Sequence, residues 1–248
     1  MTTSSYLGRQ SRAVGSRLRQ RALLAARTYL GRVTPLRDAY RRVIRRRKDE
    51  DLRLFHDVLA SGPLAGKWRV FGGAILGLER SGKLIDWDPD IDVLVLRDDF
   101  PALVRAVSDL HRSGFRLVEN FVGSDGKVIG IHLRRHGFQF DFFLADLIAP
   151  GVKAGEPAAQ FRELVLLEGS VFEQTGTLPY TDVGYVVTAG RHWPCSADRI
   201  AELEAIYGPN WRTPDRSWTG AQAPYVVARQ PYDGSPGTWT PLEDFLKP

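Results

Sequence analysis

Two aspartates stand two residues apart at the start of an apolar, β-branched run. Asp90 and Asp92 flank Ile91, and the run continues to Leu96. Side chains alternate between the two faces of a strand, so a strand here presents both carboxylates on one face. Neighbouring carboxylates repel each other unless a cation lies between them, and Mg²⁺ or Mn²⁺ binds oxygen ligands and serves phosphoryl chemistry. The pair predicts a divalent metal site; the alternative is a solvated strand end.

A third aspartate lies inside an aromatic segment. Asp141 stands between Phe140 and Phe142 in residues 138–144. A buried carboxylate without a partner is costly, so metal coordination accounts for it better than packing does. An edge strand with an exposed Asp141 is the alternative.

A glycine pair precedes the first two aspartates. Gly72 and Gly73 follow a strand-like run at 67–71 and precede a helical segment at 74–80. Backbone N–H groups at such a turn, together with the positive end of the helix, can face a phosphate. A plain turn is the alternative interpretation.

Together, the glycine pair, the short helix and the Asp-x-Asp strand resemble the signature of the nucleotidyltransferase fold shared with DNA polymerase β. More narrowly, the segment is similar to the LicD family, which includes bacterial phosphocholine transferases and the fukutin-related proteins. The matching positions are Gly72, Gly73, Leu76, Gly77, Arg80, Trp87, Asp88, Asp90, Ile91 and Asp92. Pro89 departs from the family pattern, which has an acid there. A second match comprises Trp193-Pro194, Leu203-Glu204 and residues 207–214, so the resemblance covers about 67–215.

The resemblance implies an enzyme that takes a CDP-linked donor and transfers choline, ribitol or glycerol phosphate to a sugar hydroxyl of a cell-surface glycan or glycolipid, releasing CMP. It implies that Asp90 and Asp92 hold one or two Mg²⁺ or Mn²⁺ ions. Asp141 would complete a metal site and accept the acceptor's proton.

The same resemblance implies phosphate binding by Gly72, Gly73 and Arg80, with Asp88 supporting the metal site. Trp87, Tyr207 and Trp211 either stack on the ligand or belong to the core. Two other functions stay open: a conventional nucleotidyltransferase acting on a small molecule or protein, and a non-catalytic module recruited to membranes.

Hydrophobic periodicity and breakers predict the elements that must position these residues. We expect a helix over about 35–60, strands at 67–71, 91–96, 115–122, 127–134 and 138–144, and helices at 74–80 and 100–112. The last third reads as irregular apart from a helix over 196–206. The fold class is therefore α/β (α+β), a nucleotidyltransferase-like mixed sheet flanked by helices, with a basic N-terminal helical extension.

Three parts follow along the chain: a basic arm and helix at 1–60, a LicD-like catalytic domain at 64–215, and a C-terminal tail at 216–248 packed on that domain. Composition supports a folded protein, with 43% hydrophobic and 25% charged residues. The single cysteine, Cys195, excludes an internal disulfide. The five histidines show no metal-ligating spacing apart from His132 and His136, which would face one way on a strand pair but have no carboxylate partner nearby in sequence, so we expect all five in the core or on the surface.

Charge is divided unequally along the 248 residues. Residues 1–48 hold 13 Arg and one Lys against one acid, a net charge of +13, whereas residues 49–248 carry 20 bases and 28 acids, a net charge of −8. A basic arm on an acidic body favours docking to an anionic membrane surface over nucleic-acid binding. No apolar stretch approaches the ~20 residues of a membrane span. We therefore expect a cytoplasmic protein, peripheral at the inner face of the membrane.

Overall fold

The computed structural model describes residues 34–85, 88, 90–148, 157–167, 170–215, 218 and 220–232, with backbone only at 34–46 and 221. The chain divides into two compact units, residues 1–49 and 50–248, and helix α2 (Thr34–Ser61) runs from the first into the second. The predicted basic arm before residue 34 and the end of the predicted tail after residue 232 lie outside the described residues. None of the described helices is long and apolar enough to cross a membrane.

The predicted elements up to residue 144 are confirmed, with small shifts at their ends. After α2 come β1 (Trp68–Phe71), α3 (Gly73–Ser81), β2 (Asp90–Leu96), the 3₁₀ turn η1 (Arg97–Asp99), α4 (Phe100–Arg112), β3 (Arg116–Val122), β4 (Val128–Arg135) and β5 (Phe138–Ile148). The positive φ of Gly137, +89°, closes the predicted hairpin between β4 and β5.

The prediction of an irregular last third is wrong. It contains β6 (Ala158–Leu167), β7 (Ser170–Pro179), β8 (Val183–Thr188), β9 (Arg191–Ser196), α5 (Arg199–Tyr207), the 3₁₀ turn η2 (Gly220–Gln222) and β10 (Val226–Pro231). These strands were missed because charged residues, Gly and Pro interrupt their alternation; Pro194, for instance, lies in the two-stranded sheet β8–β9, where an edge strand tolerates it. Helix α5 begins after Asp198, whose carboxylate accepts a hydrogen bond from the N–H of Ala201 at 3.0 Å.

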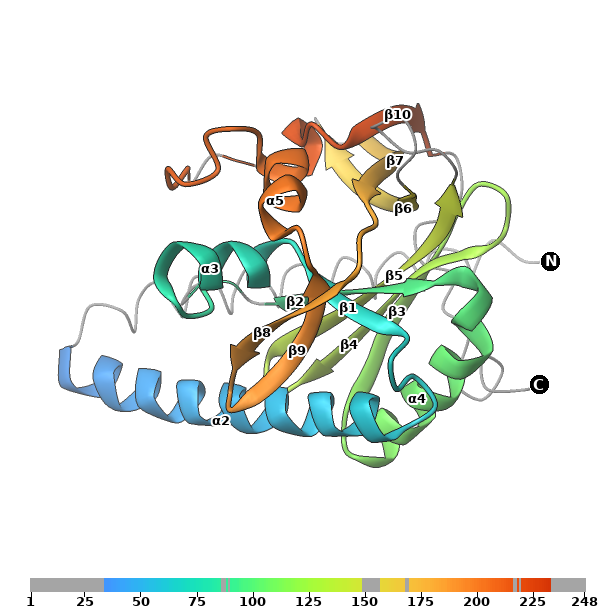
Figure 1. Ribbon diagram of the computed structural model, residues 1–248. Helices are drawn as coiled ribbons and strands as arrows, with labels where there is room; N and C mark the ends of the chain where they lie inside the picture. The colour runs from blue at the N-terminus through green and yellow to red at the C-terminus, as the bar shows by residue number, and fades with distance from the viewer. Residues whose placement is uncertain are drawn as a thin grey trace, which may run out of the picture. The chain divides into compact units, whose positions relative to one another are not determined.

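The large sheet is mixed. Its strands run in the order β1-β2-β5-β6-β7-β10, with β4 also beside β5 and β3 beside β4. Strands β2 and β5 are parallel, whereas the other pairs are antiparallel. Figure 1 shows β2 and β5 in the middle of the sheet, with α4 and α3 at its sides. This arrangement confirms the predicted α/β class with a mixed sheet flanked by helices.

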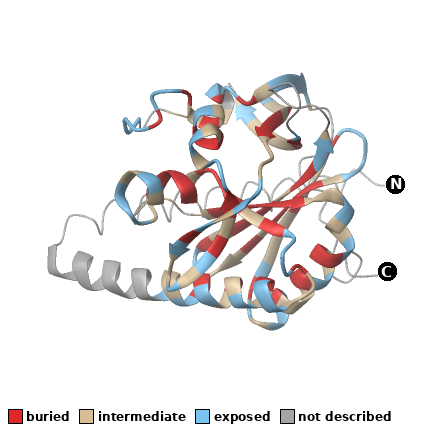
Figure 2. Ribbon diagram, in the orientation of Figure 1, coloured by how far each residue is buried: buried red, intermediate tan, exposed pale blue. Residues whose placement is uncertain are grey.

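The two faces of the sheet bury different partners. On one face, Val93 and Phe142 pack with Phe55 of α2 and Leu103 of α4. On the other face lies a second cluster that includes Leu94, Phe71, Phe161, Ile206 of α5, and Tyr225. Figure 2 shows the buried residues concentrated along the central strands. The first face of the sheet is covered by helices α2 and α4. The second face carries the smaller apolar cluster and leaves room beside it for polar side chains.

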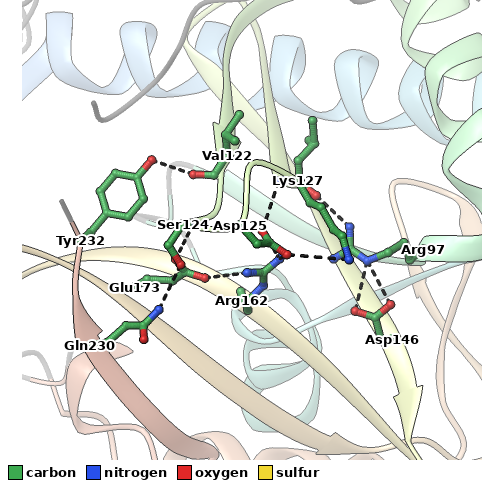
Figure 3. A network of polar contacts seen from close by, with 11 residues as sticks. Arg97, Val122, Ser124, Asp125, Lys127, Asp146, Arg162, Glu173, Gln230 and Tyr232 are labelled. Atoms are coloured by element: carbon green, nitrogen blue, oxygen red, sulfur yellow. Dashed lines mark hydrogen bonds and ion pairs between the residues drawn. The ribbon is translucent and has the colours of Figure 1, made fainter. Parts of the chain in front are cut away.

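Ion pairs join the β3–β4 turn to β6 and β7 (Figure 3). Arg162 donates to both carboxylate oxygens of Asp125 at 3.0 Å and to Glu173 at 2.9 Å. Nearby, Arg97 donates to the two oxygens of Asp146 at 3.0 and 3.1 Å. We call these five residues the arginine network; every acid in it has an arginine partner.

Candidate active site

Strand register brings the predicted acids together. In the parallel pair β2–β5, Asp92 lies opposite Asp141, and Asp90 lies opposite Gln139. Their side chains leave the sheet on the face opposite to Ile91, which is buried in the first core. Asp88, just before β2, lies close enough to raise the pKa of Asp92. We call Asp88, Asp90, Asp92 and Asp141 the carboxylate cluster.

The charges of the cluster act most strongly on Asp92. Burial raises the pKa of Asp92 well above its usual value, and the negative charges of Asp90, Asp141 and Asp88 raise it further. Among the described residues, the main contributors to this shift are burial and other acids. The cluster is therefore a place where several acids lie close together and disfavour ionisation of Asp92.

Asp141 is the most enclosed member of the cluster, at 4% exposure. Its Oδ2 accepts a hydrogen bond from Gln139 at 2.8 Å, while its Oδ1 is buried without a hydrogen-bond partner. Burial raises its pKa to about 8; the hydrogen bond from Gln139 opposes that shift, and the charge of Asp90 adds to it. A buried acceptor left without a donor is costly, which indicates a position suited to another ligand.

The donor set fits a hard divalent cation by its chemistry, because it consists of carboxylate oxygens. Asp141 Oδ1, buried and without a partner, is the observation that favours such a ligand most directly. Within the described residues, however, no three His, Cys, Asp or Glu side chains stand close enough together to hold a metal ion. The carboxylates are neighbours that would have to converge on an ion, so Mg²⁺ or Mn²⁺ binding stays a prediction.

The glycine turn lies directly beside these acids. Gly72 has a φ of +64°, and a Cβ on it would come within 3.2 Å of Asp92 Oδ2, so the position requires glycine. A Cβ on Gly73, at the start of α3, would collide with Asp88 Oδ2. The N–H of Gly72 donates to the buried carboxyl of Glu202. The turn predicted to face a phosphate thus contacts Asp92, Asp88 and Glu202, with the Asp88 carboxylate over the helix start that a phosphate would occupy.

A cleft of about 860 Å³ opens beside the cluster. Its lining residues are Gly73, Leu76, Arg80, Ile85, Asp88, Asp90, Asp92, Tyr207, Asn210, Trp211, Thr213, Pro214, Asp215 and Trp218. Acids line one side and aromatic and polar residues from the C-terminal segment line the other, in a volume suited to a small-molecule ligand. Asp141 is not among the lining residues, although it lies next to Asp92 in the sheet.

Arg80 links the two walls of the cleft. Its Nη2 donates to the backbone oxygens of Trp211 and Thr213, the latter at 3.1 Å. Its Nε is buried without a partner. Arg80 therefore holds the C-terminal wall of the cleft in place. Its predicted contact with phosphate would have to use the other nitrogens of the guanidinium.

The aromatic residues named from sequence have different positions. Tyr207 and Trp211 both line the cleft, and Trp211 is 3% exposed, so each contributes to packing as well as to the wall. The Tyr207 ring lies 4.6 Å from that of Trp218, centroid to centroid. Burial raises the pKa of Tyr207, and the charges of Asp92 and Asp88 raise it further, so its hydroxyl stays protonated. Trp87 lies outside the described residues.

Three residues near the cluster were not found from sequence. His132 was expected to be a core or surface residue without a functional role. Its Nδ1 lies 3.4 Å from Asp141 Oδ1 across the β4–β5 pair. Gln139 was missed although it stands two residues before Asp141, a spacing that puts both on one face of a strand. Glu202 was missed although it precedes Ile206 by one helical turn, a spacing that places it on the buried side of α5.

Comparison with known proteins agrees with this geometry. Residues 68–142 match the family model described as LicD/FKTN/FKRP, nucleotidyltransferase domain. The match supports the resemblance to the LicD family that the motifs of this segment indicate, and it supports a transferase of phospho-head groups as the general class. No curated protein matches the chain significantly.

Among solved structures, the chain is similar to the crystal structure of ANT(2″)-Ia in complex with adenylyl-2″-tobramycin. The two share 19% identity over 68% of this chain and 81% of the other, with a TM-score of 0.38.

Proposed function

We propose that the protein transfers a phospho-head group (choline, ribitol or glycerol phosphate) from a CDP-linked donor to a sugar hydroxyl of a cell-surface glycan or glycolipid. One observation carries the proposal: the LicD match spans β1 to β5, and the acids of that segment, Asp90 and Asp92, line a cleft of about 860 Å³. A lone Asp-x-Asp pair would be weak support; a pair next to Asp141 in register and facing a cleft is stronger.

In the proposed reaction, the acceptor hydroxyl attacks the phosphorus atom that bears the head group. The bond from that phosphorus to the oxygen of CMP breaks, and CMP leaves. Asp90, Asp92 and Asp141 would hold Mg²⁺ or Mn²⁺, which supplies positive charge against the charge that develops on the phosphate oxygens. Asp141 would take the hydroxyl's proton, and the wall formed by Tyr207, Trp211 and Trp218 would exclude water and orient the donor.

The leaving group tests this proposal. The protein is incubated with MnCl₂ or MgCl₂, extracted cell-envelope glycans and CDP-ribitol, CDP-glycerol or CDP-choline in turn, and products are identified by mass spectrometry. We expect CMP and a glycan heavier by one phospho-head group. Pyrophosphate release from CTP or ATP, with a nucleotide-modified acceptor, would replace the proposal by a conventional nucleotidyltransferase. The absence of any transfer would favour the non-catalytic module.

The charge of residues 1–48 supports a second part of the proposal, namely peripheral attachment to the anionic, cytoplasmic face of a membrane. Fourteen basic residues against one acid would attract anionic lipid by up to about 1 kcal/mol for each base that reaches the surface. Deleting residues 1–33 should weaken sedimentation with anionic vesicles, and added salt should weaken it in the intact protein. Turnover of a soluble acceptor should survive the deletion. Equal vesicle binding by the truncated protein would remove membrane attachment through this arm and leave the chemistry untouched.

A further inference from the structure

Gln139 shares the sheet face of the carboxylate cluster. It lies opposite Asp90 in the β2–β5 register and two residues before Asp141. Its side-chain Nε2 lies 2.8 Å from Asp141 Oδ2, and its Oε1 accepts a hydrogen bond from Arg134 at 2.8 Å. One amide therefore connects an arginine to a buried acid.

The orientation of this amide is fixed by the chemistry of its neighbours. A guanidinium can only donate hydrogen bonds, so the group that faces Arg134 must be the amide oxygen. The amide nitrogen then necessarily faces Asp141, where it acts as a donor. Arg134 thus determines that Gln139 presents a donor to the acid.

His132 does not compete for this role. Gln139 Nε2 also lies 3.3 Å from His132 Nδ1, which as the partner of a donor must be the acceptor nitrogen of a neutral ring. His132 Nδ1 therefore has no proton for Asp141 Oδ1, 3.4 Å away. Among the described residues, Gln139 is the one hydrogen-bond donor to the Asp141 carboxylate.

We propose that Gln139, held by Arg134, is a positioning residue for Asp141: it binds Oδ2, fixes the plane of the carboxylate and leaves Oδ1 for the reacting ligands. The proposal rests on the proposed function, because Asp141 has a role to be positioned for only if the cluster is catalytic. Hydrogen-bonding partners behind ligating carboxylates hold them in one orientation, and their loss typically costs about 10- to 100-fold in activity or metal affinity.

The first experiment compares Gln139→Leu with Gln160→Leu, its matched control. Gln160 is a half-buried strand glutamine on β6, opposite Thr177 and Asp146 and away from the cluster. Gln139→Leu should lower kcat about 10- to 100-fold with little change in the donor KM, while Gln160→Leu keeps full activity. Gln139→Glu should lower kcat further, because it places a carboxylate where the donor was. A wild-type kcat in Gln139→Leu would overturn the proposal.

The second experiment needs no activity. Urea unfolding of Gln139→Leu, Asp141→Asn and the double variant forms a thermodynamic cycle, and a non-zero coupling would show that Gln139 holds Asp141. If the changes in unfolding free energy of the two single variants simply add in the double variant, the proposal is overturned. Coupling combined with an unchanged kcat in Gln139→Leu would also overturn it, because the contact would then be purely structural. If the wild type transfers no head group with any donor, the proposed function fails, and the cycle alone decides whether Gln139 holds the acid.

Discussion

The carboxylate cluster and the arginine network differ in the environment that they provide for acidic side chains. In the arginine network, Glu173 is 2% exposed and is paired with Arg162, and hydrogen bonds and ion pairs to Lys127 and Arg162 lower the pKa of Asp125 despite some burial. In the cluster, the pKa of Asp92 is raised by burial and by further acids. The acids of the network are paired with arginines inside the fold, whereas Asp88, Asp90 and Asp92 of the cluster line an open cleft.

This difference distinguishes acids that stabilise the fold from acids that destabilise it. A buried acid with a fixed basic partner is compatible with stability alone, while neighbouring uncompensated acids are retained at a cost. Substitutions in the carboxylate cluster should therefore lower activity without lowering stability. Substitutions in the arginine network should lower stability without lowering activity.

The largest effect is expected from Asp92→Asn. Loss of one carboxylate from a site that supplies several kcal/mol of charge stabilisation should lower transfer at least about a hundredfold. Because the change also removes a repelled charge, the free energy of unfolding should stay constant or rise. Both are measured by CMP release and urea denaturation, with Asp146→Asn as a control acid outside the cluster. Full activity in Asp92→Asn would end the assignment of the cluster as a catalytic site.

The opposite result is expected from Arg162→Met in the arginine network. It leaves Glu173 buried without its ion-pair partner, which should lower the free energy of unfolding by about 3 kcal/mol. The N–H of Ser124, 2.8 Å from Glu173, still donates, so the loss should lie at the lower end for a broken buried pair. Transfer per folded molecule should not change. Arg105→Met, at an exposed position of α4, serves as the control, and equal stability of the two variants would contradict the role given to the network.

A smaller effect is expected from pH. Burial raises the pKa of both Asp141 and Glu202 to about 8, above the value of about 4 for an unfolded chain. The folded protein therefore keeps protons on these two groups that the unfolded chain releases, so their contribution to stability is fully present below about pH 4 and is lost as the pH rises toward about 8. Urea unfolding in EDTA across this range should show the decline.

Asp141→Asn and Glu202→Gln should each flatten that profile, because each removes one group whose pKa is raised by burial. Glu204→Gln is the control, since Glu204 is exposed on the same helix as Glu202. A profile of the wild type that is flat or rises with pH would show that the cluster does not hold its protons as described.

The smallest effect is expected from Asp146→Asn. Asp146 is 54% exposed in its pair with Arg97, and exposed ion pairs contribute less than about 1 kcal/mol. The change in unfolding free energy should therefore be below about 1 kcal/mol and should shrink further in high salt. A loss of unfolding free energy as large as that of Arg162→Met would contradict the expectation that the exposed ion pairs of the arginine network stabilise the fold less than the buried ones.

Sequence alone predicted the first half of the fold and the acids of the site, because both depend on local patterns. Alternation in β2 and β5 shows which face Asp90, Asp92 and Asp141 share. It does not show that β2 and β5 are parallel neighbours, because strands about fifty residues apart can pair without any local sequence pattern that indicates it. The resemblance to LicD supplied only the expectation that Asp141 completes a metal site with Asp90 and Asp92.

The remaining parts of the site depend on contacts that no periodicity reports. Arg80 was predicted to bind phosphate because of its motif, but its partners are backbone oxygens of residues far along the chain. Glu202 and Gly72 come together only after α5 has packed on the sheet. The strands after residue 157 were missed for a simpler reason, because mixed polar and apolar positions hide their alternation.

The two walls of the cleft come from separate stretches of chain, and this has a consequence for how such proteins diverge. The acidic wall belongs to the segment that the family model covers, which ends at residue 142, while the opposite wall is built from residues 207–218. Mutations in the second stretch can therefore remodel what the cleft accommodates without disturbing the parallel pair that carries the acids. Selection for a new ligand can act on a dozen residues while an old chemistry is inherited unchanged.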